Sequence, residues 1–276
     1  MSKIKILIAT HKEAEFPQNE IFLPIQVGKK NAKVKINIQG DDEGENISEK
    51  NPQYCELTAI YWAWKNLKEY EYIGLFHYRR YISFEKTTFI TRVVRNVKYY
   101  ISKFPMNIIY PGDNYIHWSS IETNFTKQKQ YFSNDFPNEM KLSLGSNEIY
   151  AIKKIKFSNT NIKTFWSTAV SLVVMNILET IISDKFPLYL NSYRKQMQGN
   201  EIHPCNIFIF KKYIFEEYSE FVFSTLSELE ASLLNVNITP LPRTVGYVGE
   251  VLTSTFILYK IANGHKIKEL SLMNID

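Results

Sequence analysis

Residues 72–81 read Tyr-Ile-Gly-Leu-Phe-His-Tyr-Arg-Arg-Tyr, an apolar run that passes directly into histidine and arginine. Short apolar runs rich in aromatic and β-branched residues are typical of strands that are buried on both faces of a parallel sheet. Residues 3–10, Lys-Ile-Lys-Ile-Leu-Ile-Ala-Thr, have the same character and predict an early central strand. Between the two runs, Asn51-Pro52 introduces a helix over residues 53–69, whose apolar residues recur at helical spacing. Strand, helix and strand with short joints predict a right-handed βαβ unit.

Further elements are predicted along the rest of the chain. The patterns indicate a short strand over 107–110, a helix over 164–183, a strand over 206–210, a helix over 215–233 and a final helix over 250–262. Neither an internal repeat nor an interdomain linker is visible. The sequence therefore predicts one large α/β unit.

Composition sets the class of protein. The 276 residues are 45% hydrophobic and 22% charged, which excludes a disordered chain, and the 2 cysteines exclude a disulfide scaffold. The 14% aromatic content fits either core packing or a sugar-stacking surface. The net charge of +5 suits phosphorylated ligands or an anionic lipid surface but falls short of a dedicated nucleic-acid binder.

Two features of the chain bear on its location. The first residues lack the charged, apolar and small-residue regions of a secretory signal, so we expect a cytoplasmic protein. No stretch reaches the roughly 20 apolar residues that a bilayer span needs.

A cationic cluster follows the strand of residues 72–76. If the strand geometry continues, His77 and Arg79 project to one face and Arg80 to the other. Two guanidiniums beside an imidazole favour a phosphate or pyrophosphate ligand at the carboxyl end of a strand. The alternative is that the arginines pair with acidic residues elsewhere, such as those of the Asp41-Asp42 loop.

That loop, residues 37–49, is dense in Gly, Asp and Asn. Its carboxylates could hold a divalent ion, but their positions do not fit a calcium loop and no His/Cys set accompanies them. A solvated turn and a ligand-binding loop both stay open.

The last third of the chain offers three polar residues near the ends of predicted elements. His203 is placed to bind a sugar hydroxyl or to act as a base. Asn206 opens the predicted strand. Glu250, at the start of a predicted helix, either serves the helix dipole and pairs with Arg243 or acts in catalysis.

Together these motifs resemble a bacterial capsular and exopolysaccharide biosynthesis glycosyltransferase family that was long catalogued as a domain of unknown function. The resemblance is strong over residues 3–82 and 200–258. It rests on residues 9–12 (Ala-Thr-His-Lys), 24–28, 41–48, 51–66 (Asn-Pro-Gln-Tyr-Cys-Glu onward), 72–81 and 206–212, and on the series Arg243, Gly246, Glu250 and Leu252.

The resemblance implies a fold, a donor and an acceptor. The fold is a GT-A-like (Rossmann-like) mixed, mainly parallel sheet flanked by helices, in a single glycosyltransferase domain over 1–276. About residues 1–110 would bind the nucleotide sugar and about 111–276 the acceptor. The implied donor is UDP-galactofuranose, known for some relatives, or another UDP-hexose. The implied acceptor is a growing capsular, exopolysaccharide or lipopolysaccharide glycan, and such acceptors are often lipid-linked. Peripheral contact with the inner membrane would use the basic residues of the stretch 92–103 on anionic headgroups; a solvated helix face explains these residues equally well.

Site roles follow from combining the resemblance with residue chemistry. GT-A enzymes commonly carry an Asp-x-Asp metal site where this chain has His77-Tyr78-Arg79-Arg80. Fixed cations can stabilise a departing diphosphate, so we expect a hexosyltransferase without a metal cofactor; Mn or Mg would enter only through the Asp41-Asp42 loop. Glu250 and then His203 are the expected catalytic bases.

The nucleoside and sugar are expected to contact a larger set of residues. These are Thr10, His11, Lys12, Gln26, Asp41, Asp42, Asn46, Glu56 and Asn206. The alternative function is a non-catalytic glycan- or phosphate-binding protein that uses the same cleft. Nucleic acid is not an expected partner.

Overall fold

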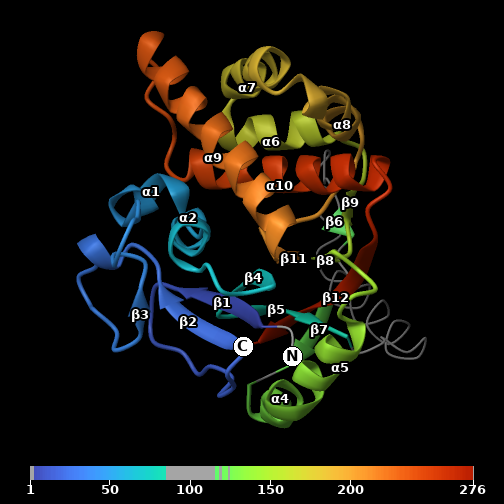
Figure 1. Ribbon diagram of the computed structural model, residues 1–276. Coiled ribbons are helices and arrows are strands. Elements are labelled where there is room, and N and C mark those ends of the chain that lie inside the picture. Colours follow the sequence, from blue (N-terminus) through green and yellow to red (C-terminus); the bar gives the residue numbers. More distant parts are fainter. Residues whose placement is uncertain (1–2, 85–115, 118–119, 124, 276) are drawn as a thin grey trace, which may run out of the picture.

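A nine-stranded sheet runs through the molecule, and helices pack on both of its faces (Figure 1). The computed structural model describes residues 3–84, 116–117, 120–123 and 125–275. The strand predicted over 107–110 and the basic stretch 92–103 lie outside these residues.

One half of the sheet is parallel. Strand β1 (Ile4–Thr10) lies between β2 (Phe22–Gln26) and β4 (Tyr72–His77), and β3 (Gln39–Gly40) follows β2. The two predicted strands and their parallel pairing are confirmed. Because β1, β2 and β4 run in the same direction, their carboxyl ends meet at one edge of the sheet.

The other half is mixed. It contains β5 (Arg80–Ser83), β7 (Ser120–Thr123), β8 (Ile149–Ile152), β11 (Phe208–Lys211) and β12 (Ile267–Ile275). Strand β11 is antiparallel to both β4 and β8, and β12 lies between β5 and β8. The pairings of β4, β5, β12, β8 and β11 therefore close into a ring. The α/β class is confirmed, whereas the mainly parallel character holds only for β1 to β4. A small second sheet joins β6 (Ile116–His117), β9 (Ile155–Phe157) and β10 (Glu201–Ile202).

A close approach of backbones explains the glycine in the stretch of residues 72–81. Gly74 pairs with Ile209 across β4 and β11. A Cβ at this position would lie 2.8 Å from the carbonyl oxygen of Phe208, so a side chain does not fit between the strands.

Two predicted helices are broken and one is longer than expected. Cys55, with a φ of 51°, separates α1 (Asn51–Tyr54) from α2 (Leu57–Asn66). Ser171, with a φ of 80°, separates α6 (Ile162–Val170) from α7 (Leu172–Lys185). The last helix, α10, begins at Thr244 and spans Thr244–Ala262. The other helices are α4 (Phe125–Gln130), α5 (Phe136–Ser143), α8 (Pro187–Gln198) and α9 (Lys212–Asn235).

No single helix in the described part of the chain has the length and apolar character to cross a bilayer. Helices α6 and α7 reach that length only together, and the pair bends by 116° at its break.

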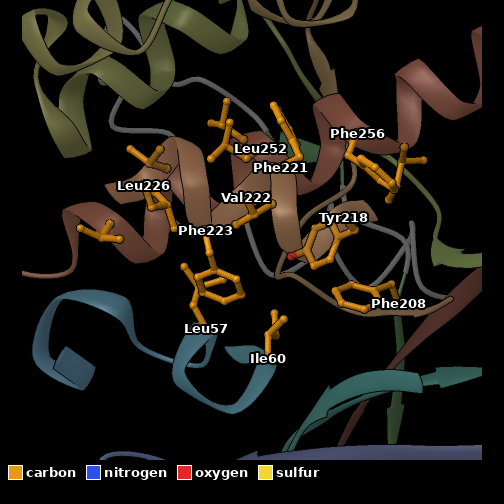
Figure 2. Packing of buried hydrophobic residues seen from close by; sticks show 14 of the residues in the cluster. Leu57, Ile60, Phe208, Tyr218, Phe221, Val222, Phe223, Leu226, Leu252 and Phe256 are labelled. Atoms are coloured by element: carbon orange, nitrogen blue, oxygen red, sulfur yellow. The ribbon is translucent and has the colours of Figure 1, made fainter. Parts of the chain in front are cut away.

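The core is built on both faces of β1. Leu7 and Ala9 face the cluster that includes α2, α9 and α10, whereas Ile6 and Ile8 face the cluster that includes α5. Figure 2 shows the first cluster, in which side chains of α9 lie near those of α2 and α10: Leu57, Ile60, Tyr218, Val222, Leu226, Leu252 and Phe256. The largest fully buried side chains are all Tyr or Phe, so much of the aromatic content is core packing.

Candidate functional site

A cavity of about 370 Å³ opens at the edge where the parallel strands end. Its walls come from the ends of β1, β2 and β4, from the α1–α2 joint and from the residue before α10. The lining residues are Ala9, Thr10, His11, Val27, Asn51, Pro52, Cys55, Glu56, His77, Tyr78 and Arg243. The expectation that the ends of β1 and β4 contribute to one site is met by Thr10, His11 and His77.

Strained backbone gathers around this cavity. Seven non-glycine residues in the described part of the chain have a positive φ, and four of them are Cys55, Cys205, Asn206 and Arg243. Left-handed backbone costs free energy in residues with a side chain, and such residues cluster at functional sites. The break at Cys55 ends α1 and places the next residue, Glu56, in the wall of the cavity.

The carboxylate of Glu56 is held by a relay of hydrogen bonds. Its Oε1 accepts a hydrogen bond of 2.8 Å from Nδ2 of Asn206. Oδ1 of Asn206 in turn accepts from the hydroxyl of Thr253 at 2.7 Å, so the hydroxyl of Tyr218, 2.8 Å away, donates to Thr253. The Glu56 side chain is 13% exposed. Helices α9 and α10 therefore fix a carboxylate that still reaches the cavity, as a general base or a sugar-hydroxyl ligand requires.

His77 lies beside this carboxylate and has a lowered pKa. Its Nε2 lies 2.8 Å from the carbonyl oxygen of Cys205 and 4.0 Å from Oε1 of Glu56. Burial lowers the pKa of His77 below its usual value, an effect that the nearby Glu56 opposes. Because a carbonyl only accepts hydrogen bonds, Nε2 carries the proton. The lowered pKa disfavours a positive charge on His77, and Nε2 is not available as a metal ligand.

The two arginines after His77 do not lie as predicted. The chain turns at Tyr78-Arg79, and Arg80 pairs with His77 as the first residue of β5. Nη1 of Arg80 lies 3.4 Å from Sγ of Cys205, the same residue whose carbonyl oxygen contacts Nε2 of His77. The Arg79 guanidinium instead lies 5.4 Å from the centre of the Tyr78 ring. The prediction that His77 and Arg79 share one face of the sheet and Arg80 the other was wrong, because strand β4 ends at His77.

Arg243 is the guanidinium that lines the cavity. It has a φ of 64° and directly precedes α10. Its Nε lies 3.4 Å from Sγ of Cys55, and its guanidinium lies 5.4 Å from the Tyr247 ring. From the sequence, Arg243 was expected as a partner for Glu250 and as part of the family motif, not as a ligand-binding residue. Its place was missed because the helix was expected to begin six residues later.

Glu250 lies behind the cavity and not in its wall. Its Oε2 accepts a 2.9 Å hydrogen bond from the backbone N–H of Cys205. Burial, followed by the charge of Glu56, raises the pKa of Glu250 to about 7, against the effect of Arg80 and Arg243. Glu250 therefore holds the left-handed Cys205-Asn206 segment. The first-choice base of the sequence analysis does not line the cavity, and Glu56 does.

Glu250 should make stability depend on pH. Its carboxyl ionises near pH 4.5 in the unfolded chain but near pH 7 in the folded protein, so wild-type stability falls as pH rises through this window. In Glu250→Gln this contribution is absent. The free energy of unfolding of wild type minus that of the variant should fall by up to about 3 kcal/mol between pH 4.5 and 8. Urea unfolding at several pH values measures it; a constant difference would mean an ordinary carboxyl pKa.

His203 is a structural residue. Its side chain is 2% exposed, its Nδ1 lies 2.8 Å from the carbonyl oxygen of Ile152, and its backbone N–H donates to Ser254. Burial lowers the pKa of His203 to about 4. His203 was expected to be a base or a sugar ligand, but its ring is buried in the interior and does not line the cavity.

Four residues of the predicted donor set stabilise loops. The carboxylate of Asp41 is fully buried and accepts hydrogen bonds from the backbone of Gly28 and Lys29 and from the hydroxyls of Ser48 and Thr58. Buried Gln26 bridges the carbonyl of Val34 and the N–H of Ile36. Asn46 donates to the carbonyl of Asp42 within the loop, and neither residue lines the cavity. The loop is thus a structural support: none of these four residues lines the cavity, and among the described residues no ion pair joins Asp41 or Asp42 to Arg79 or Arg80.

The sequence predicts that a metal ion, if one binds, would bind at the Asp41-Asp42 loop. Asp41 already accepts four hydrogen bonds, and across the described residues no group of three His, Cys, Asp or Glu side chains is arranged to hold a metal ion. The residues at the end of β4 do not fit a divalent ion either, since Nε2 of His77 donates to a carbonyl.

Asp41→Asn should destabilise the fold. An amide cannot accept from all four donors and would direct its own N–H groups at some of them. We expect a loss of about 2–4 kcal/mol in the free energy of unfolding. The matched change Asp42→Asn, in the half-buried neighbour, should cost less than about 0.5 kcal/mol. Equal losses in the two variants would contradict the structural role.

A second cavity, of about 350 Å³, lies on the other side of Tyr78, which lines both. It is bounded by Lys12, Glu13, Ala14, Glu15, Tyr78, Arg79, Phe125, Thr126 and Ile275. Lys12, which was expected to contact the nucleoside, lines this second cavity and not the first.

Comparisons with known proteins give one family and one similar solved structure. Residues 5–261 match the family described as "Domain of unknown function (DUF4422)". No curated protein sequence matches the chain significantly. Among solved structures, the apo form of the bifunctional glycosyltransferase WbbM superposes with a TM-score of 0.79 at 25% sequence identity. The match covers 100% of this chain and 46% of that one, so the chain spans less than half the length of this relative.

Proposed function

The chain belongs to the family described as Domain of unknown function (DUF4422), and we propose that it is a glycosyltransferase that moves a sugar from a nucleotide-sugar donor to a growing glycan. The likeness to a bifunctional glycosyltransferase over the whole chain supports the class. One observation of the site carries the proposal: the cavity at the ends of the parallel strands holds a fixed carboxylate, Glu56, and a guanidinium, Arg243.

Each group has a place in the reaction. The diphosphate of the donor binds at Arg243 and His11, and its sugar lies against Glu56. A hydroxyl of the acceptor attacks the anomeric carbon, its proton passes to the Glu56 carboxylate, and the bond from that carbon to the diphosphate oxygen breaks. The guanidinium stabilises the charge that develops on the departing nucleoside diphosphate. No step in this scheme requires a metal ion.

The finer assignment follows the sequence resemblance. The donor is a UDP-hexose, with UDP-galactofuranose among the candidates. The acceptor is a capsular, exopolysaccharide or lipopolysaccharide glycan on a lipid carrier at the cytoplasmic face of the inner membrane. The resemblance of residues 51–66 and 72–81 supports this, and both segments contribute to the cavity.

A donor screen followed by a turnover assay tests the proposal. Purified protein is first screened for thermal stabilisation by a panel of UDP-, GDP- and dTDP-sugars, because a ligand that binds the folded state raises its melting temperature. The stabilising donor is then incubated with the protein, and release of the nucleoside diphosphate is measured by chromatography, without and with a glycan acceptor. Release that increases with acceptor supports transfer. Donor binding without release would favour the glycan- or phosphate-binding alternative.

The same assay tests metal independence. We expect the rate in excess EDTA to stay within about twofold of the untreated rate, because fixed cations take the part of a metal. Loss of activity in EDTA that is restored by Mn²⁺ would overturn this prediction.

A further inference from the structure

The wall between the two cavities is cationic. Nζ of Lys12 and the guanidinium of Arg79 each lie 5.4 Å from the centre of the Tyr78 ring. The edge of the Tyr78 ring also contacts His11, with ring centres 5.5 Å apart. Two cations therefore meet at one aromatic residue, on the side of the second cavity.

Among the described residues, no acidic side chain pairs with either cation. Within residues 3–84, 116–117, 120–123 and 125–275, no ion pair forms to Lys12 or Arg79, although Glu13 and Glu15 line the same cavity. Contact with an aromatic face leaves the charge of a cation intact. Two exposed, unpaired cations on the rim of a cavity favour an anionic ligand.

The positive charges of these cations also act on His11. After burial, the causes that lower the pKa of His11 are the charges of Lys12, Arg243 and Arg79. These three cations come from three separate segments of the chain. The positive potential therefore extends from Arg243 in the first cavity, past His11 and Tyr78, to Lys12 and Arg79 in the second.

We propose that the second cavity is the acceptor subsite and that it takes a sugar that carries an anionic group, with that group held between Lys12 and Arg79. The assignment rests on the proposed function, because only a transferase needs a second sugar site beside the donor. The apolar surfaces of Ala14, Phe125 and Ile275 provide a floor for a sugar ring. Glu13, Glu15 and Thr126 provide acceptors and a donor for its hydroxyls.

Binding of simple sugars tests the chemistry directly. Glucose 1-phosphate, methyl β-glucuronide and neutral methyl β-glucoside are titrated by ligand-observed NMR with UDP present to occupy the first cavity. We expect at least one anionic sugar to bind about tenfold or more tightly than the neutral one. The phosphate and carboxylate probes show which anion the subsite accepts.

Variants show at which cavity the anionic sugar binds. Lys12→Ala/Arg79→Ala should remove the advantage of the anionic sugar and change the Kd for UDP by less than about threefold. The matched control Arg194→Ala/Lys195→Ala, which removes the same two charge types from α8, should keep the advantage. Conversely, Arg243→Ala should weaken UDP and leave the sugar anion bound.

Three results would overturn the acceptor subsite. These are equal affinity for charged and neutral sugars, an unchanged advantage in Lys12→Ala/Arg79→Ala, and displacement of the anionic sugar by UDP. Failure of the proposed function looks different, because the donor would then bind without release of nucleoside diphosphate while the charge dependence of sugar binding persisted.

Discussion

Replacement of Glu56 by Gln is expected to lower sugar transfer about 1000-fold while the protein stays folded. The carboxylate lines the first cavity and is held through Asn206. Gln keeps an oxygen that can accept from Asn206, so the position of the side chain is preserved. An amide cannot take up the proton of an attacking hydroxyl, so the chemical step loses its base.

The measurement is the rate of transfer at saturating donor, together with donor affinity and melting temperature. Glu45→Gln removes an exposed carboxylate outside the cavity and should keep the wild-type rate within about twofold. A rate for Glu56→Gln within tenfold of wild type would mean that another group acts as the base. Donor affinity that falls as much as the rate would indicate a binding role in place of proton transfer.

The second large effect is expected for Arg243→Ala, which should lower turnover about 100- to 1000-fold and also weaken the nucleotide sugar. The guanidinium of Arg243 lines the first cavity. Removing it withdraws the charge that stabilises the departing diphosphate. Arg243→Lys should recover only part of the rate, because an ammonium lacks the planar fork that binds two phosphate oxygens.

Arg79→Ala is the informative comparison. Arg79 and Arg243 are both exposed, but Arg79 lines the second cavity. The Arg79 variant should therefore raise the KM for the acceptor and leave donor affinity nearly unchanged. If Arg79→Ala abolished donor binding and Arg243→Ala did not, the diphosphate would have to lie on the other side of Tyr78.

The fold could be predicted where pattern and local geometry agree. The continuous apolar runs of β1 and β4 and the helical spacing in α9 identified their elements. The breaks at Cys55 and Ser171 were missed because the apolar spacing continues across both positions, although Ser171 has a positive φ and caps α7 through a hydrogen bond from the N–H of Val174. Strand β12 was missed as well, and with it the mixed half of the sheet.

The site was located better than its chemistry was assigned. The ends of β1 and β4 line one cavity as expected, since parallel strands bring their carboxyl ends together. Polarity alone could not separate Glu56, which reaches the cavity, from Asp41, which is equally acidic but saturated by hydrogen bonds. The turn at Tyr78-Arg79 places Arg79 at the second cavity, and the early start of α10 places Arg243 in the wall of the first.

The position of β12 has a consequence for biosynthesis. This strand lies between β5 and β8 and also pairs with β7, although it follows all of them in the chain. A nascent chain on the ribosome can assemble β1, β2 and β4 early, but the β4–β5 hairpin that carries His77 and Arg80 has no neighbour on its far side until residues 267–275 emerge. Until then β5 and β8 expose unpaired edges, which are prone to aggregation and are natural substrates for chaperones.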